Sequence, residues 1–170
     1  NERSRQRLET LKREAQRMKR IVQNLLRFAR QTQPERKQVD FAASLREVVV
    51  LREYQLRTQG IQLVSKFDSD LPLVEVDDDQ SKHVLVNVLS NAADAVKNSV
   101  EKIITLEVSA ESGHVCLKVS DTGPGFTDLD RALDPFYTTK PIGEGTGLGL
   151  SICYGIINSH GGELRISNLK

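Results

Sequence analysis

The 170-residue sequence has few cysteines and no long hydrophobic run. Its two cysteines, Cys116 and Cys153, lack the number and spacing that a disulfide framework or a structural metal site needs. Both lie in apolar segments, which predicts buried free thiols. No segment reaches the roughly 18 apolar residues of a membrane span, and the charged first residues lack the apolar core of a signal peptide. We therefore expect a soluble cytoplasmic chain that makes no membrane contact, even if it is the soluble part of a longer membrane protein.

A large excess of one charge is also absent, because 24 Lys and Arg residues face 23 Asp and Glu residues. The charges are unevenly divided, however. Residues 1–37 carry 12 basic and 4 acidic side chains, a net charge of +8, whereas residues 38–170 carry 12 and 19, a net charge of −7. The basic segment has no interleaved aromatic residues, so we interpret its charges as a solvated helix surface rather than a nucleic-acid contact.

The basic segment predicts one long helix, because residues 2–32 contain neither Gly nor Pro and Pro34 then ends the pattern. Its apolar residues follow a 3,4 spacing over three heptads, which favours a seam for another helix. Additional apolar residues widen the stripe, as in a helical bundle. The seam contains Leu8, Leu11, Ala15, Met18, Val22, Leu25 and Ala29, and Ile21, Leu26 and Phe28 widen it.

The rest of the chain alternates short strand and helix patterns, which predicts an α+β fold built as a two-layer α/β sandwich. We expect a helical arm at 1–33, a linker at 34–37 and a separate domain at 38–170. The predicted strands are 38–41, 61–67, 71–76, 103–110, 114–121 and 163–167. The predicted helices are 44–59, capped by Ser44, then 80–98, a short one at 128–133, and 148–159.

One helix carries an unusual polar stripe. His83, Asn87, Asn91 and Asp94 stand at i, i+4, i+8 and i+11, so they share one face of the predicted helix 80–98. Such a stripe is often only the solvent face of a helix. The alternative is a binding face, since two Asn one turn apart offer oxygens to a hard cation and amide hydrogens to phosphate.

Two glycine-rich segments follow. DTGPGF, residues 121–126, ends a predicted strand, and its glycines allow the backbone to approach a flat ligand closely. GEGTGLGLS, residues 143–151, runs into a helix N-terminus, which is a favourable environment for an anion. The glycine spacing matches neither the P-loop nor the Rossmann fingerprint.

In this order, the three motifs resemble the GHKL ATPase superfamily with its Bergerat nucleotide-binding fold, whose members include gyrase-type topoisomerases and sensor histidine kinases. NVLSNAADAV (87–96) resembles the Asn box of the kinases, and DPFYTTK (134–140) resembles their Phe box. GTGLGLSICYGIINSHGG (145–162) is similar to the nitrogen-regulation type of sensor kinase. The helical arm resembles the second helix of the kinases' dimerisation and phosphotransfer hairpin. The resemblance implies a mixed sheet with helices on one face.

The resemblance also implies ATP and Mg²⁺ as cofactors. Asn91 would be the Mg²⁺ ligand with support from Asn87, and Asp121 would accept the exocyclic amine of adenine. Lys140, on a mobile lid, would meet phosphate charge and act in catalysis together with Asn87. The implied ATP-binding set is Asn87, Asn91, Asp94, Asp121, Gly123, Gly125, Phe126, Tyr137, Thr138, Thr139, Lys140, Gly145, Thr146, Gly147, Leu148 and Gly149.

By the same resemblance, the chain would be the catalytic core of a two-component sensor kinase, homodimeric through helix 2–32 and serving a response regulator receiver domain. His83 stands where gyrase-like relatives place the Glu that activates water, which favours a kinase over an ATPase. None of His83, His114 and His160 has the acidic neighbour of a phosphoacceptor, so we expect the acceptor, and the family's last strand, outside this chain. The alternatives are an anti-sigma-type serine kinase and a non-catalytic dimerisation or regulator-docking module.

Overall fold

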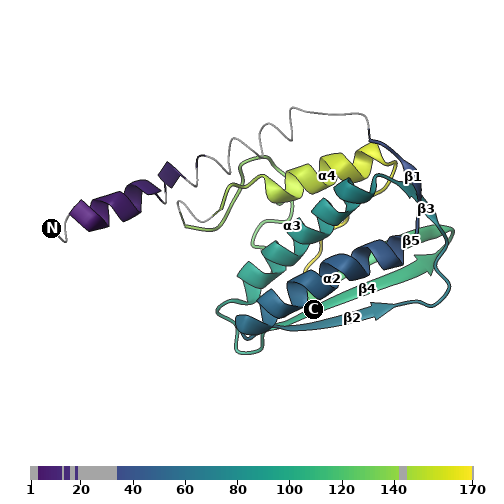
Figure 1. Ribbon diagram of the computed structural model, residues 1–170, viewed down its shortest axis with the longest axis horizontal. Coiled ribbons are helices and arrows are strands. Elements are labelled where there is room, and N and C mark those ends of the chain that lie inside the picture. Colours follow the sequence, from purple (N-terminus) through teal and green to yellow (C-terminus); the bar gives the residue numbers. More distant parts are fainter. Residues whose placement is uncertain (1–3, 13, 16–17, 19–33, 142–144, 170) are drawn as a thin grey trace.

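A computed structural model describes residues 4–12, 14–15, 18, 34–141 and 145–169 (Figure 1). Residues 4–12 are helical, and the side chains of Leu8, Leu11 and Met18 are exposed. The remaining apolar positions of the predicted seam, from residue 21 to residue 29, lie outside the described residues. The elements that follow are β1 (Lys37–Val39), α2 (Phe41–Thr58), β2 (Gln62–Phe67), β3 (Val74–Val76), α3 (Asp78–Val96), β4 (Ile103–Glu111), β5 (His114–Asp121) and α4 (Gly149–Ser159).

The main sheet is mixed and has the order β2-β4-β5, with β2 parallel and β5 antiparallel to β4. Ile104, Leu106 and Val108 of β4 are fully buried and alternate with half-buried residues, so one face of the sheet meets the core. Helices α2 and α3 cover that face, and α4 packs on α3 (Figure 1). A second, two-stranded sheet pairs β1 with β3 in antiparallel fashion. The main sheet and the helices that cover it confirm the prediction of a mixed sheet with helices on one face.

Both long helices begin at an aspartate. The Asp40 side chain accepts a hydrogen bond from the backbone N–H of Ala43 and caps α2, and Asp77 caps α3 through the N–H of Gln80. The expectation that Ser44 caps α2 is wrong, because this residue lies inside the first turn and is buried. Its hydroxyl donates to the carboxylate of Asp78 instead.

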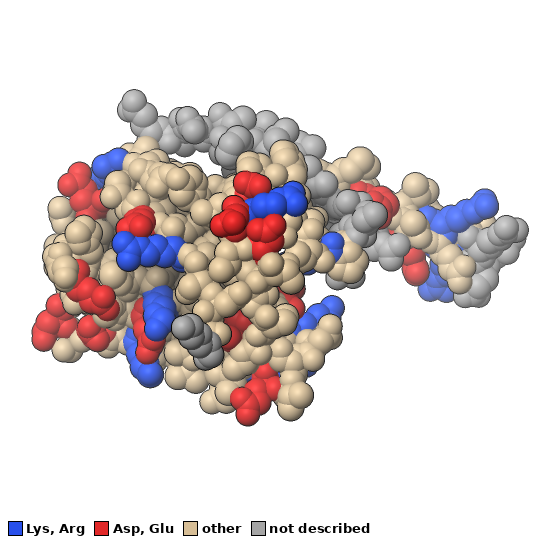
Figure 2. Space-filling model, turned by 180° about the vertical axis from the view of Figure 1, so that it is seen from behind, with Lys and Arg blue, Asp and Glu red and all other residues tan. Residues whose placement is uncertain are grey.

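The Ser44 contact ties α2 to the start of α3. Burial opposes ionisation of Asp78, but hydrogen bonds from Ser44 and Lys82 outweigh it and hold the pKa of this carboxyl below its ordinary value. Lys82 also pairs with Glu47 of α2, at 2.7 Å. Figure 2 shows acidic and basic side chains intermixed on one face of the described body. Ion pairs of the described residues include Lys66–Glu107 and Lys82–Glu47.

Two further expectations are wrong. Residues 128–133 form successive turns and no helix, because they are held by isolated bonds such as the one from Ala132 N to Leu129 O. Residues 163–167 form no strand, since the described tail is fixed by a side chain, Asn168, rather than by a backbone ladder. Cys153 is buried as expected, whereas Cys116 is only half-buried. Within the described part of the chain, no helix is both long and apolar enough to cross a membrane.

We expect the core to depend on the buried face of α2. Leu45 is 0 % exposed within the core and Leu51, on the same helix, is 72 % exposed. Leu45→Ala should lower the free energy of unfolding by about 2–5 kcal/mol because it leaves a cavity, whereas Leu51→Ala should change it by less than about 0.5 kcal/mol. Urea unfolding followed by circular dichroism measures both, and equal losses would contradict this core.

Candidate functional site

Helices α3 and α4 lie side by side and run in opposite directions (Figure 1). At one end, the N–H of Asp77 donates to Nε2 of His160 over 3.0 Å. Further along, Cys153 Sγ lies 3.9 Å from the carbonyl oxygen of Val84. At the other end, a Cβ added to Gly149 would lie 3.6 Å from Nδ2 of Asn91. The small residues Gly149 and Cys153 therefore lie opposite the two asparagines of α3.

The polar stripe on α3 is mostly covered. His83, Asn87 and Asn91 are half-buried, and only Asp94 is exposed. Asn87 Nδ2 lies 3.3 Å from Nε2 of His83. The interpretation of the stripe as the solvent-exposed face of a helix therefore holds only for Asp94. The other three side chains lie in the region where α4 packs on α3.

The loop after β5 packs directly against the end of α3. Asp121 Oδ1 accepts from the N–H of Gly123 over 2.8 Å. A Cβ on Gly123 would lie 2.6 Å from that oxygen and 2.8 Å from Cβ of Ala95, so only glycine allows this approach. The carboxylate of Asp121 is thereby held beside α3.

Asn168 fixes the second half of this loop, and the sequence analysis did not single it out. Its side chain accepts from the N–H of Phe126 at 2.8 Å and donates to the Phe126 carbonyl at 2.9 Å. Gly125 has a φ of +76°, and a Cβ there would lie 2.6 Å from Asn168 Oδ1. The sequence contains no signal that Asn168 holds the loop at Phe126, because a single Asn near the end of a predicted strand is common and indicates no particular contact.

Lys140 reaches α3 from the segment that precedes the second glycine-rich loop. The Lys140 ammonium pairs with the carboxylate of Asp94. The backbone N–H of Lys140 donates to Thr138 Oγ1, with 3.2 Å between the nitrogen and the oxygen. A Cβ on Gly145 would lie 2.5 Å from the same Thr138 hydroxyl, so the two ends of this segment are closely packed. Residues 142–144, with Gly143 among them, lie outside the described residues.

The start of α4 is held by a close backbone contact. Gly147 has a φ of +64°, and a Cβ there would overlap the backbone of Phe136, whose N–H donates to the Gly147 carbonyl over 2.9 Å. Leu148 is buried and precedes α4, whose first turn has no side-chain cap. The first N–H groups of α4 therefore keep their capacity for an anion.

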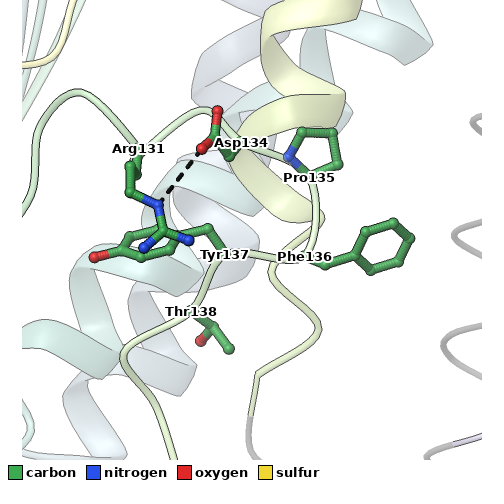
Figure 3. Close-up of a pocket in the computed structure, with 6 residues that line it drawn as sticks. All are labelled: Arg131, Asp134, Pro135, Phe136, Tyr137 and Thr138. Atoms are coloured by element: carbon green, nitrogen blue, oxygen red, sulfur yellow. Dashed lines mark ion pairs between the residues drawn. The ribbon is translucent and has the colours of Figure 1, made fainter.

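Part of the Phe-box segment forms a separate feature, an open hollow of about 520 Å³ (Figure 3). The Arg131 guanidinium lies 4.5 Å from the centre of the Tyr137 ring, and its Nε lies 3.7 Å from Asp134 Oδ2. The Phe136 ring points away from this cluster (Figure 3) and is 62 % exposed. Of the expected site residues, Phe-box members Tyr137 and Thr138 line the hollow, whereas Asp121 and the α3 asparagines do not.

Three separate segments thus meet on one and a half turns of α3. Gly149 lies at Asn91, Lys140 at Asp94, and Gly123 at Ala95. The structure brings several members of the expected set together. They are the residues on α3, those at Asp121–Gly123, Lys140, and those at Gly145–Gly149. Tyr137 lies apart under Arg131. Two positions that the sequence analysis missed, Ala95 and Asn168, support the loops from behind.

Residues 76–170 match the family of histidine kinase-, DNA gyrase B- and HSP90-like ATPases. The sensor histidine kinase ZraS of Escherichia coli strain K12 is 30 % identical over 162 residues, which cover 94 % of this chain and 34 % of ZraS. The chain thus spans about a third of the length of this curated relative.

Solved structures are also similar. Full-length ShkA in complex with AMPPNP superposes with a TM-score of 0.76 at 27 % identity, covering 92 % of this chain and 34 % of ShkA. The histidine kinase ThkA in complex with the response regulator TrrA superposes with a TM-score of 0.71 at 28 % identity, covering 88 % of this chain and 42 % of ThkA. The chain therefore belongs to the histidine kinase-, DNA gyrase B- and HSP90-like ATPase family, with the Bergerat fold of a sensor histidine kinase catalytic core.

Proposed function

We propose that this chain binds Mg-ATP at α3 and transfers its γ-phosphoryl group to a histidine of a hairpin helix outside the chain, for relay to an aspartate of a response regulator. The convergence of three separate segments on residues 91–95 of α3 carries this proposal. Phosphoryl transfer depends mainly on positioning and on charge neutralisation, which such a convergence supplies. ShkA in complex with AMPPNP and ThkA in complex with TrrA support the choice of nucleotide and partner.

The metal would be held by an amide rather than by a carboxylate cluster. Among the described residues, no group of three or more His, Cys, Asp or Glu side chains is placed to hold a metal ion. A hard cation takes amide oxygens, and Asn91 and Asn87 offer two of them one turn apart on the covered face of α3. These residues therefore fit Mg²⁺ that is bound jointly with the phosphates of ATP. When bound, Mg²⁺ neutralises phosphate charge.

The base would lie at the Asp121 loop. The oxygen of Asp121 that does not accept from Gly123 is available for the exocyclic amine of adenine, and Gly125 and Phe126 border the same loop. An ionised carboxylate accepts hydrogen bonds and donates none, so it selects adenine over guanine.

The triphosphate would lie toward the start of α4. Gly145, Thr146 and Gly147 lead into the start of α4, whose first N–H groups have no side-chain cap and would provide donors, and Leu148 and Gly149 complete the turn into the helix. Lys140 would supply a cation from the proposed lid, which also includes Tyr137, Thr138 and Thr139. Asp94 holds Lys140 in place, so we assign Asp94 a supporting role for this lysine rather than direct contact with phosphate.

The arm would serve dimerisation. The described seam residues Leu8, Leu11 and Met18 are exposed in the single chain, as expected of a face that another helix covers. We therefore retain the division into an arm (1–33), a linker (34–37) and a catalytic domain (38–170). The linker is attached to both site helices, because the N–H of Glu35 donates to Asp77 and Arg36 donates to the Ser159 carbonyl.

The acceptor histidine would come from outside these residues. His114 is exposed at the start of β5, His83 contacts Asn87, and His160 joins α4 to Asp77 through its ring. Each of the three is therefore placed within the catalytic domain itself and not on a hairpin helix.

We expect Asp121→Asn to weaken binding of an ATP analogue by about 10- to 100-fold and to reduce the preference for adenine over guanine. The new amide keeps an oxygen for the Gly123 N–H but places a donor where adenine also presents one. Fluorescence titration with adenine and guanine nucleotides measures both effects. Asp68→Asn, an exposed change on the β2–β3 connection, is the matched control and should bind like the original chain.

We expect Asn91→Ala to remove most of the Mg²⁺-dependent part of nucleotide affinity, about tenfold, while binding without Mg²⁺ changes little. Calorimetric titration with and without Mg²⁺ separates the two parts. Asn98→Ala, an exposed asparagine just beyond α3, is the control. An unchanged Mg²⁺ dependence in Asn91→Ala would remove this residue from the metal site.

We expect the chain to label a separate polypeptide that carries an intact phosphoacceptor hairpin of a sensor kinase, when supplied with Mg²⁺ and γ-labelled ATP. The label should be lost in acid and stable in alkali, as for phosphohistidine, and should be absent with the Asp121→Asn variant. Acid-stable label would indicate the serine kinase. Tight ATP binding without label on any cognate hairpin would indicate the non-catalytic docking module.

A further inference from the structure

The Asn87 amide on α3 has neighbours on two sides, and neither is in the expected ATP-binding set. One is His83, whose Nε2 lies 3.3 Å from Asn87 Nδ2. The other is Cys153 on α4, whose Sγ lies 3.9 Å from the carbonyl oxygen of Val84, about one turn before Asn87. Burial raises the pKa of this thiol, and the Asn87 side chain acts in the opposite direction, as a donor to the sulfur does. Cys153 is fully buried, and His83 and Asn87 are half-buried. The amide is therefore enclosed between its own helix and the neighbouring one.

The hydrogen-bonding capacity of these groups fixes which end of the amide faces them. The Cys153 thiol has a single proton, and its sulfur donates toward the Val84 carbonyl at 3.9 Å. The sulfur can therefore meet Asn87 only as an acceptor, and the group that faces it must be the NH₂ end.

The same reasoning sets the state of His83. An amide nitrogen donates and has no acceptor, so Nε2 of His83 must accept from Asn87. The NH₂ group has two hydrogens, and His83 and Cys153 account for both of them. The carbonyl oxygen of Asn87 is then left to face the opposite direction, away from both partners.

We propose that His83 and Cys153 are positioning residues that lock the Asn87 amide with its oxygen directed into the site. The inference rests on the proposed function, in which that oxygen supports the bound metal and triphosphate. A side-chain amide can rotate by half a turn, and the rotated form would present hydrogens where an oxygen is needed. In this interpretation His83 and Cys153 each have a role in the site beyond helix packing.

The test compares substitutions that keep an acceptor with substitutions that remove it. His83→Gln and Cys153→Ser retain an acceptor for the amide, whereas His83→Leu and Cys153→Ala remove it. We expect the two acceptor-removing variants to weaken binding of Mg²⁺ and an ATP analogue by about 3- to 10-fold, and the two acceptor-keeping variants to stay within about twofold. His114→Leu, which changes an exposed histidine on β5, is the matched control.

A spectroscopic measurement tests the same inference without nucleotide. In the ¹⁵N-labelled chain, the side-chain amide signals of Asn87 are identified by their loss in Asn87→Asp. In His83→Leu they should move toward the position of a free amide and exchange faster with solvent, and in His83→Gln they should do so much less. Thermal unfolding of each variant checks that the fold is intact.

The two readouts separate the two proposals. If the original chain fails to bind the nucleotide, the proposed function fails, but the amide signals still decide whether His83 orients Asn87. If the nucleotide binds and His83→Leu leaves both the affinity and the amide signals of Asn87 unchanged, the positioning role is overturned.

Discussion

The close approach of α3 and α4 is the contact on which the rest of the site depends. The two helices are antiparallel, and small residues on α4 lie opposite the asparagines of α3. A larger residue in place of Cys153 would displace Asn87, because protein interiors are packed without spare volume. At the far end, the ring of His160 accepts from the N–H of Asp77 and joins the end of α4 to the start of α3. Helix packing therefore sets the orientation of the α3 face that carries the proposed site.

Glycines then allow the loops to reach this framework. Gly123 lies against Ala95 and Gly147 against Phe136, at distances that a Cβ would not permit. Gly123 has no positive φ, so glycine is required there only because of the close contact. Gly147 has both a close contact and a positive φ, so glycine is required there for both reasons. Each glycine brings a loop onto α3 or beside α4, and the chemistry of the site follows from where those loops are placed.

Electrostatics explains how a domain with a net negative charge accommodates a polyanion. The charge of −7 belongs to the whole of residues 38–170, and much of it is paired at the surface, as in the contacts of Glu107 with Lys66 and Lys118. Near the proposed phosphate position the local groups are different: amides, the uncapped start of α4, and the Lys140 ammonium held by Asp94. Screening limits the long-range effect of surface charges, so the local groups dominate.

The sequence alone determined the features that depend on local pattern. Strand alternation predicted the paired strands 103–110 and 114–121, and the order of the three motifs led, through the family resemblance, to the family and its mixed sheet. Local signals could not decide between competing partners: Ser44 has a good capping side chain, but Asp40 caps α2 and Ser44 bonds Asp78 of another helix. The tail 163–167 has a strand pattern, but its position is set by Asn168 and Phe126, which are 42 residues apart.

Only the tertiary structure decided which polar residues act together. Asp94 and Lys140 are separated by 46 residues and meet because the segment that carries Lys140 lies against α3. The proposed grouping of His83, Asn87 and Cys153 depends on α4, which returns antiparallel to α3 and brings Cys153 beside this part of α3. Spacing along a helix identifies residues that share a face, but it does not say what covers that face. The sequence therefore specified the motifs and the fold, and packing between distant segments specified how the motifs are oriented.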